Sequence, residues 1–333
     1  MNAALKNISY YLPENVLTNE KLSNEFSFLT PEEIYKRSGV RKRHITYKGI
    51  LGSDLAYCAA IRLFEEYALD KQSIDFLLLC TTALDYKVPA TSSILQDRLK
   101  LPKNIGTMDI PMGCTGFVYG LSFAKGLIAS GQATKVLLLT AEVPSIVCHP
   151  EDYALRMIFG DAGAAAVIEA DTKNEIGEFV FGSDGSGAMD LHVERSFTRH
   201  PVDASWLEEY NEVGGMKYGR MKMDGSAIFS FALRVVPSLV NDILDKNDVA
   251  FEDVDLFIFH QPNGYLLNVI KRKLQIPDDK FFSYMEEVGN TVSCTIPIAL
   301  REAENQGKIK VGDTILVAGF GTGLSWAGTI LKK

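Results

Sequence analysis

The chain of 333 residues contains few cysteines and few histidines, five of each, and none of them stands in a C-x-x-C pattern or another metal-ligand spacing. An odd number of cysteines without such a spacing argues against a disulfide framework and against a structural zinc site. We therefore expect no metal and free thiols in a reducing compartment.

Long apolar runs and an excess of positive charge are also missing. The longest apolar runs have about the length of a strand, whereas a membrane helix needs about 20 residues. Lys and Arg number 34 against 42 Asp and Glu, a net charge of −8, which gives no support to nucleic acid or an anionic membrane as a partner. The N-terminal residues lack the charge and apolar pattern of a signal peptide. These features predict a cytoplasmic protein.

Strand-like and helix-like segments alternate along the chain. Short continuous apolar runs, typical of strands buried on both faces, occur at residues 76–82, 135–140, 255–260 and 314–318. Amphipathic segments occur at residues 54–67, 115–130 and from 297 onward. The alternation predicts an α/β fold in which helices pack on sheets.

The order of these segments repeats. IDFLLLC at residues 74–80 matches VDLFIFH at residues 254–260, an offset of 180, and the units opened by Cys114 and Asn290 lie 176 residues apart. Any α/β protein repeats such units, but the near-constant offset and the shared Asp at the strand start favour a duplication. We predict two similar halves, residues 1–171 and 172–333, with Cys114 and Asn290 in equivalent turns.

Cys114 is the candidate nucleophile. It lies in DIPMGCTGF, where an extended segment passes through a glycine-flanked turn into a helix. Exposed N–H groups and the helix dipole favour a thiolate there and predict a lowered pKa, as in covalent catalysis. The alternative is a small buried hydrophobic residue, the usual environment of cysteine. The other four cysteines are interpreted as structural: Cys58, Cys80, Cys148 and Cys294.

Two polar residues and a glycine turn complete the candidate site. His260 ends a predicted strand, where α/β folds commonly place functional groups, although a structural histidine is the alternative. Asn290, in VGNTV, gains weight from its predicted equivalence to Cys114. The segment GFGTGL at residues 319–324 ends too near the C-terminus for a dinucleotide loop. It is better suited to present backbone N–H groups as half of an oxyanion hole.

Taken together, GCTGF, HQPN, GNT and the terminal GFGTGLSW resemble the β-ketoacyl-acyl-carrier-protein synthase III family over essentially the whole chain. The resemblance implies a duplicated thiolase-like αβαβα five-layered fold, a homodimer and no cofactor. An elongating ketosynthase would have a second His in place of Asn290. A thiolase would have a second Cys in the last glycine loop.

The resemblance implies an acyltransferase that performs a decarboxylative Claisen condensation. Cys114 would take an acyl group from a coenzyme A or carrier-protein thioester, and His260 and Asn290 would donate hydrogen bonds to the enolate formed from malonyl carrier protein. The 3-ketoacyl product would serve fatty acid initiation or a specialised lipid or polyketide pathway. The residues assigned to the oxyanion hole and its neighbour are Gly321, Thr322, Gly323 and Phe320.

Departures from the family pattern bear on the substrates. Glu33 and Tyr153 stand where the family often holds the coenzyme A adenine between a Trp and an Arg, so a carrier-protein donor fits as well as coenzyme A. Val88 stands where a Phe often limits the acyl pocket from across the dimer, which predicts room for a longer or branched primer.

A basic run is the candidate dock for an acidic acyl carrier protein, although a solvated helix face is the usual explanation of so short a run. Two other functions stay open. One is an acyltransferase of the same fold that joins the acyl group to another nucleophile without decarboxylation. The other is a non-catalytic partner subunit, against which the intact Cys, His and Asn argue. The basic run consists of Lys271, Arg272 and Lys273.

Overall fold

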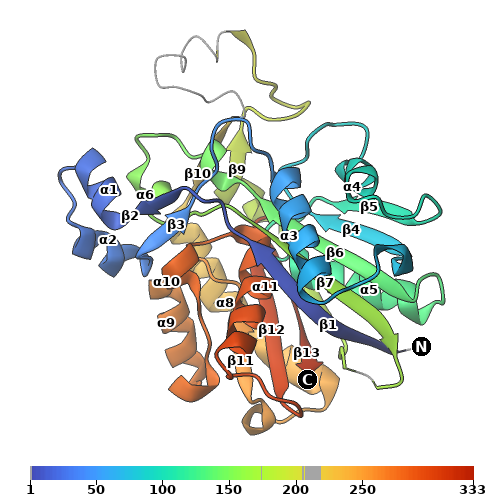
Figure 1. The fold of residues 1–333 in the computed structure, drawn as a ribbon. Helices are drawn as coiled ribbons and strands as arrows, with labels where there is room; N and C mark the ends of the chain where they lie inside the picture. Colours follow the sequence, from blue (N-terminus) through green and yellow to red (C-terminus); the bar gives the residue numbers. More distant parts are fainter. Residues whose placement is uncertain (1, 174, 205, 207–218) are drawn as a thin grey trace.

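The computed structural model describes residues 2–173, 175–204, 206 and 219–333. Two mixed sheets stack with helices between them and on both outer faces (Figure 1), which gives five layers in the order α, β, α, β, α. The predicted fold class is confirmed.

The first sheet contains five strands, and its central strands are apolar at almost every position, as expected for strands covered on both faces. Strands β5, β4 and β6 run parallel to one another, whereas β7 runs antiparallel to β6 and β1 runs antiparallel to β7. The strand order is β1 (Asn2–Tyr11), β7 (Ala162–Asp171), β6 (Lys135–Glu142), β4 (Phe76–Cys80) and β5 (Gly106–Ile110).

The second sheet repeats this arrangement. Strands β11 and β12 are parallel, and β13 and β8 are antiparallel to their neighbours. Phe257 of β11 also forms a parallel bridge with Phe281, at the place that β5 takes in the first sheet. The strand order is β8 (Val180–Ser183), β13 (Ser325–Lys332), β12 (Thr314–Gly321) and β11 (Leu256–Phe259). The two sheets share one topology, as a duplication requires, while the division at residue 171, where β7 ends, stays a prediction.

Helices α5 (Gly116–Ala129) and α11 (Thr295–Asn305) form the middle layer. Helix α5 contacts strands of both sheets, and its apolar residues share one buried cluster with them. Helices α3 (Gly52–Glu66) and α4 (Thr91–Leu99) cover the outer face of the first sheet. Helices α8 (Gly225–Asn247) and α9 (Gly264–Leu274) cover the outer face of the second.

Within the described ranges, α8 is the one helix with the length and apolar composition of a membrane span. The helix contains no unbroken apolar run of that length. Its apolar residues, from Phe231 to Leu244, pack on the second sheet, which is the environment of a core helix.

The predicted ranges agree with the observed elements to within a few residues. Strand β6 continues past the predicted residue 140 to Glu142, because it pairs with β7 up to Ala162. Strand β12 likewise continues to Gly321. The remaining elements are β2 (Val16–Thr18), α1 (Asn19–Glu25), α2 (Pro31–Ser38), β3 (Lys42–His44), α6 (Tyr153–Arg156), β9 (Leu191–Glu194), β10 (Arg220–Met223) and α10 (Met285–Val288).

Candidate active site

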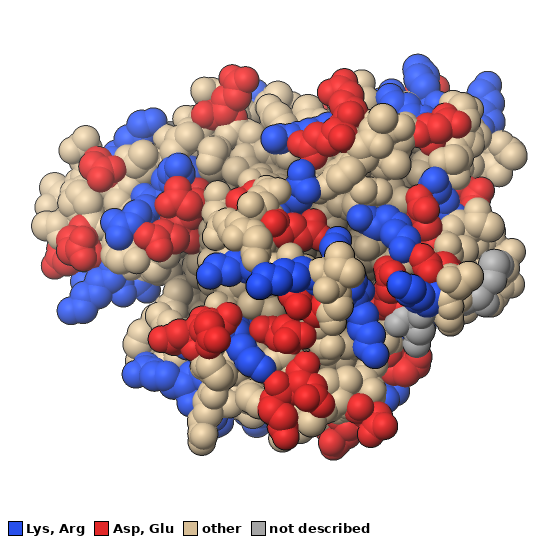
Figure 2. Space-filling model, turned by 60° about the horizontal axis from the view of Figure 1, so that its bottom comes forward, with Lys and Arg blue, Asp and Glu red and all other residues tan. Residues whose placement is uncertain are grey.

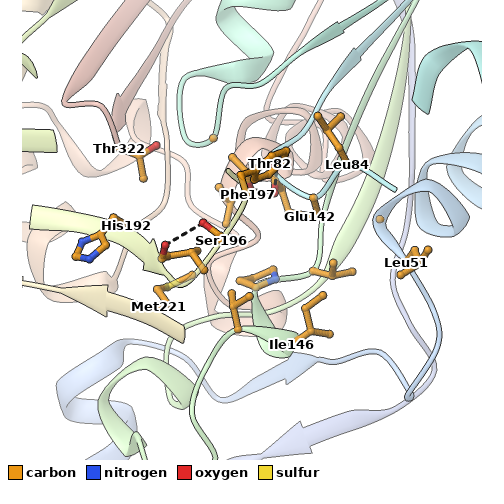
Figure 3. Close-up of a pocket in the computed structure, with 18 of the residues that line it drawn as sticks. Leu51, Thr82, Leu84, Glu142, Ile146, His192, Ser196, Phe197, Met221 and Thr322 are labelled. Atoms are coloured by element: carbon orange, nitrogen blue, oxygen red, sulfur yellow. Dashed lines mark hydrogen bonds between the residues drawn. The ribbon is translucent and has the colours of Figure 1, made fainter. Parts of the chain in front are cut away.

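A cavity of about 710 Å³ lies at the carboxyl ends of β4 and β6 and is also lined by residues of the paired strands β9 and β10. Cys114 and Thr322 belong to its wall. Figure 3 shows Thr82 and Glu142 side by side in this wall, with Thr322 and His192 on the other side of the view. The apolar part of the lining, suited to an acyl chain, includes Leu51, Leu84, Val143, Ile146, Phe159, Leu191, Val193 and Met221.

Cys114 lies in the turn between β5 and α5, two residues before the helix begins. Its side chain is almost completely buried and faces the end of β12. A Cβ atom placed on Gly321 would lie 2.5 Å from the sulfur, so the glycine is what lets β12 come this close. The backbone N–H of Thr322 donates to the thiol. The last glycine turn therefore lies beside the turn that contains Cys114.

The ionisation of Cys114 differs from the prediction. Burial raises the pKa of the thiol to about 12, although the backbone N–H of Thr322 opposes this shift, and the nearby Glu142 carboxyl raises the pKa further. The predicted lowering was wrong because the helix terminus does not offset removal of the sulfur from water. The thiol therefore carries its proton at neutral pH and must lose it during attack on a substrate.

His260 follows the last residue of β11 and is 1% exposed. The Thr295 hydroxyl donates to the carbonyl of Val292 over 3.0 Å, so its oxygen is left to accept from Nδ1–H of His260, 2.8 Å away. This assignment leaves Nε2 without a proton in the neutral ring. Burial lowers the pKa of His260 to about 3. The ring is therefore neutral at physiological pH, and Nε2 becomes a donor once it has taken a proton.

Asn290 is held by its backbone beside Phe159. Its N–H donates to Ile158 over 2.9 Å, and its carbonyl accepts from Gly160 over 3.1 Å. The side-chain oxygen accepts from the N–H of Val292, which leaves the amide NH₂ as the available donor.

Val292 connects the three predicted residues, although no motif in the sequence indicated it. It lines the cavity, shares a buried cluster with Cys114 and Phe159, and is bonded to Asn290 through its N–H. Its φ of +54° is unfavourable for a β-branched residue. Such strain is typical of functional sites, but no local sequence preference indicates it here.

The repeat was predicted with the wrong register. Thr115 contacts Gly319 and Ser325 in the second sheet, while Cys294 contacts Thr140 and Ala162, the matching strand positions in the first. Strands β6 and β12 start 179 residues apart. Ser293, not Asn290, is therefore the counterpart of Cys114.

The remaining predicted groups have different surroundings. Phe320 packs against the His260 ring, with centroids 5.8 Å apart, and Gly323 has a φ of +132°, which disfavours any side chain. Val88 is 79% exposed and does not line this cavity, although Leu84 and Tyr86 of the same loop do. Its proposed position across a dimer stays a prediction.

The basic run ends helix α9. Lys271 is half-buried and forms an ion pair with Asp278, whereas Arg272 and Lys273 are exposed. The face of the molecule in Figure 2 shows Lys and Arg interspersed with Asp and Glu, without a broad field of one sign.

The residues at the adenine positions have local partners. Glu33 completes a capping box with Thr30, and Tyr153 packs edge-on against Phe26 and Phe28. In the part of the chain that the structure describes, no group of three or more His, Cys, Asp and Glu is placed to hold a metal ion.

The sequence and the fold match those of known proteins. Models of the N-terminal and C-terminal parts of 3-oxoacyl-[acyl-carrier-protein] synthase III match residues 108–185 and 244–333. A β-ketoacyl-[acyl-carrier-protein] synthase III of Clostridium perfringens is 34% identical, over 99% of both chains.

Solved structures give the same result. A crystal structure of a 3-oxoacyl-(acyl-carrier-protein) synthase III shares 38% identity over both whole chains with a TM-score of 0.94. The corresponding enzyme of Pseudomonas aeruginosa PAO1 shares 31% identity with a TM-score of 0.88, covering 100% of this chain and 98% of its own.

The contact between Gly321 and Cys114 predicts how a methyl group at position 321 changes the reactivity of the thiol. Gly321→Ala should lower the second-order rate constant of Cys114 alkylation by iodoacetamide at least tenfold, because the methyl and the sulfur cannot both keep their places. Gly126→Ala, on the exposed face of α5 with open space around its Cβ position, is the matched control and should react like the wild type. Equal rates for both variants would contradict the contact.

The lowered pKa of His260 predicts an acid-dependent loss of stability. Below about pH 6.5 the unfolded chain binds a proton at this residue and the folded chain does not, so the unfolding free energy falls as the pH falls towards 3. Between pH 7.5 and 5.5 the wild type should lose about 1.4 kcal/mol more than His260→Gln. Urea unfolding at both pH values measures the difference, and parallel losses would refute it.

Proposed function

The chain belongs to the 3-oxoacyl-[acyl-carrier-protein] synthase III family, and we propose that it carries an acyl group on Cys114 before condensing it with a malonyl thioester. It is a condensing enzyme of the acyltransferase class. The observation that carries the assignment of the nucleophile is the buried Cys114 thiol, placed between an apolar cavity and the backbone of the last glycine turn.

In the first half-reaction the Cys114 sulfur attacks the carbonyl carbon of an acyl thioester. The thiol proton passes to Nε2 of His260 and then to the departing thiolate, so the imidazole is neutral before and after. Backbone N–H groups of Cys114 and of the turn at residues 321–323 hold the oxyanion. The high pKa of the thiol and the low pKa of the ring support a resting site in which both groups are neutral, so the proton moves only as the bond from sulfur to the acyl carbon forms.

In the second half-reaction a malonyl thioester loses CO₂. The side-chain NH₂ of Asn290 donates to the enolate oxygen. The predicted donation from His260 is not available to the neutral ring, because its proton lies on Nδ1. The carbanion attacks the acyl carbon, a carbon–carbon bond forms, the carbon–sulfur bond to Cys114 breaks and a 3-ketoacyl thioester leaves. The Cys114 thiolate then takes a proton from water, which restores the thiol. The geometry of Asn290 supports this role, since its side-chain oxygen already accepts a hydrogen bond from the N–H of Val292 and its NH₂ is left to donate.

The partners of the reaction are part of the same proposal. The malonyl donor is an acyl carrier protein, the working unit is a cytoplasmic homodimer, and no cofactor or metal takes part. The primer donor is either coenzyme A or a carrier protein. Glu33 is engaged with Thr30 and Tyr153 with Phe28, so these two residues form no adenine site that would favour coenzyme A. The exposure of Val88 supports its placement against a second subunit, with space for a longer or branched primer.

Intact-protein mass spectrometry tests the function. Wild type and Cys114→Ala are incubated with acyl-CoA and acyl-carrier thioesters and then with malonyl carrier protein. We expect an acyl adduct on the wild type only, discharged by malonyl carrier protein with release of CO₂. An adduct that malonyl carrier protein leaves in place would identify an acyltransferase for another nucleophile. Absence of any adduct would leave a non-catalytic partner subunit.

The carrier protein is proposed to dock on Arg272 and Lys273. Cations in the last turn of a helix also complement its dipole, which explains the pair without docking. Lys271 contributes less, because Asp278 already neutralises it.

Charge reversal separates these explanations. Arg272→Glu with Lys273→Glu should raise the KM for acyl carrier protein about tenfold at low salt, with little change on small thioesters. The control is Lys308→Glu with Lys310→Glu, two exposed positions before β12, at the opposite end of that strand from Gly321. An equal loss on small thioesters would show that the basic pair stabilises α9 instead.

A further inference from the structure

Glu142 is a buried acid in the wall of the catalytic cavity that the condensation described above does not use. It is the last residue of β6, it is 1% exposed, and it lines the same cavity as Cys114. Its bonded partners in the described part of the chain are hydroxyl and amide groups, and no cation is among the causes that set its pKa. Burying a carboxyl group without a cation beside it lowers the stability of the folded state, so its presence here needs an explanation.

The hydrogen bonds of Glu142 join two distant segments. Thr82, just after β4, donates its N–H over 3.2 and 3.3 Å and its hydroxyl over 2.6 Å. Ser293, just before α11, donates its hydroxyl over 3.0 Å. One carboxyl thus ties the end of the first sheet to the start of the middle helix of the second half.

Both tied segments lie beside the turn that carries the nucleophile. The Thr82 methyl lies 3.4 Å from the Cβ position of Gly113, and the Ser293 Cβ lies 3.3 Å from that of Gly116. These two glycines flank Cys114 closely in sequence. We propose that Glu142 is a positioning residue for Cys114, acting through Thr82 and Ser293; this rests on the proposed role of Cys114 as nucleophile.

The internal repeat supports this role. Glu142 ends β6 as Gly321 ends β12, and Ser293 is the counterpart of Cys114. In one half a glycine lets the backbone approach the reactive thiol. In the other half the same position carries a carboxylate that binds the matching hydroxyl. The two halves therefore use equivalent positions for different tasks. Gly321 lets backbone N–H groups reach the sulfur, and Glu142 holds Ser293 beside the turn that contains Cys114.

The charge of Glu142 gives the role a signature. Burial raises the pKa of Glu142 to about 7, opposed by the bonds from Thr82 and Ser293, and the Glu142 carboxyl raises the pKa of Cys114. The other titratable groups around it are Asp161, whose pKa is raised, and the thiols of Cys80 and Cys294, whose pKa values are raised by burial. The reactivity of Cys114 should therefore show a step near pH 7 that belongs to Glu142.

Two substitutions separate the effect of the Glu142 hydrogen bonds from the effect of its charge. Glu142→Gln keeps an oxygen for Thr82 and presents NH₂ to the Ser293 hydroxyl, which can turn to accept it. It should acylate within about threefold of the wild type but lose the step near pH 7 in the iodoacetamide profile. Glu142→Ala removes the hydrogen bonds to both Thr82 and Ser293 and should lower kcat/KM for acylation at least tenfold, since small misplacements of a nucleophile cost about that much or more.

Two variants that each remove one hydrogen bond, together with a matched control, separate loss of positioning from misfolding. Thr82→Val and Ser293→Ala each remove one bond and should each lower acylation about threefold or more, even if Glu142→Ala folds poorly. Asp75→Asn is the control, because Asp75 binds the N–H and hydroxyl of Thr134 in the same way at the opposite end of β4 and β6. It should acylate like the wild type.

The outcomes are distinct. Wild-type acylation at Cys114 is measured first, and its absence would end the proposed function rather than this inference. If the wild type is acylated but Glu142→Ala, Thr82→Val and Ser293→Ala all match it, Glu142 has no positioning role. Loss in Asp75→Asn equal to that in Glu142→Ala would mean general loosening of the first sheet, and a step near pH 7 that survives in Glu142→Gln would assign the charge effect elsewhere. Either result overturns the proposal.

Discussion

The close approach of the β12 backbone to the Cys114 sulfur depends on the burial of α5 between two sheets. Because α5 packs on both sheets at once, its first turn cannot move away from either one. The turn before it is then enclosed by β12 on one side and by the ends of β4 and β6 on the other. Only glycine at position 321 leaves room for the thiol in that arrangement.

This enclosure also determines the chemistry. A sulfur removed from water holds its proton, so the group that accepts the proton and the N–H groups that stabilise the oxyanion must already be in place. His260 is kept neutral by its own burial, and Asn290 is oriented through Val292. The strained backbone of Val292 is stabilised by bonds on both sides. Cys114, His260 and Asn290 are therefore neutral, buried groups rather than an ion pair.

Apolar runs and helical periodicity predicted the sheets, the middle helices and the positions of Cys114 and His260, since these depend on burial along a single segment. The repeat register failed because Gly289-Asn290 was matched to Gly113-Cys114 as a similar glycine turn. The positions of the elements place Ser293 there instead, since α5 and α11 each begin 19 residues before the strand that follows them. The pKa of Cys114 failed because a local motif shows the helix terminus but not the second sheet that buries it. Glu142 and Val292 acquire their roles through contacts across the two halves, which no single segment reveals.

The most direct test of the account is a crystal structure of the protein after acylation by a thioester. The account predicts that the acyl chain lies in the cavity along Leu84 and Ile146, with its carbonyl oxygen bonded to the N–H of Cys114 and to the turn at residues 321–323. The Asn290 amide should face the space left for the enolate. An acyl group attached to another residue, or a carbonyl oxygen pointing away from that turn, would contradict the central claim.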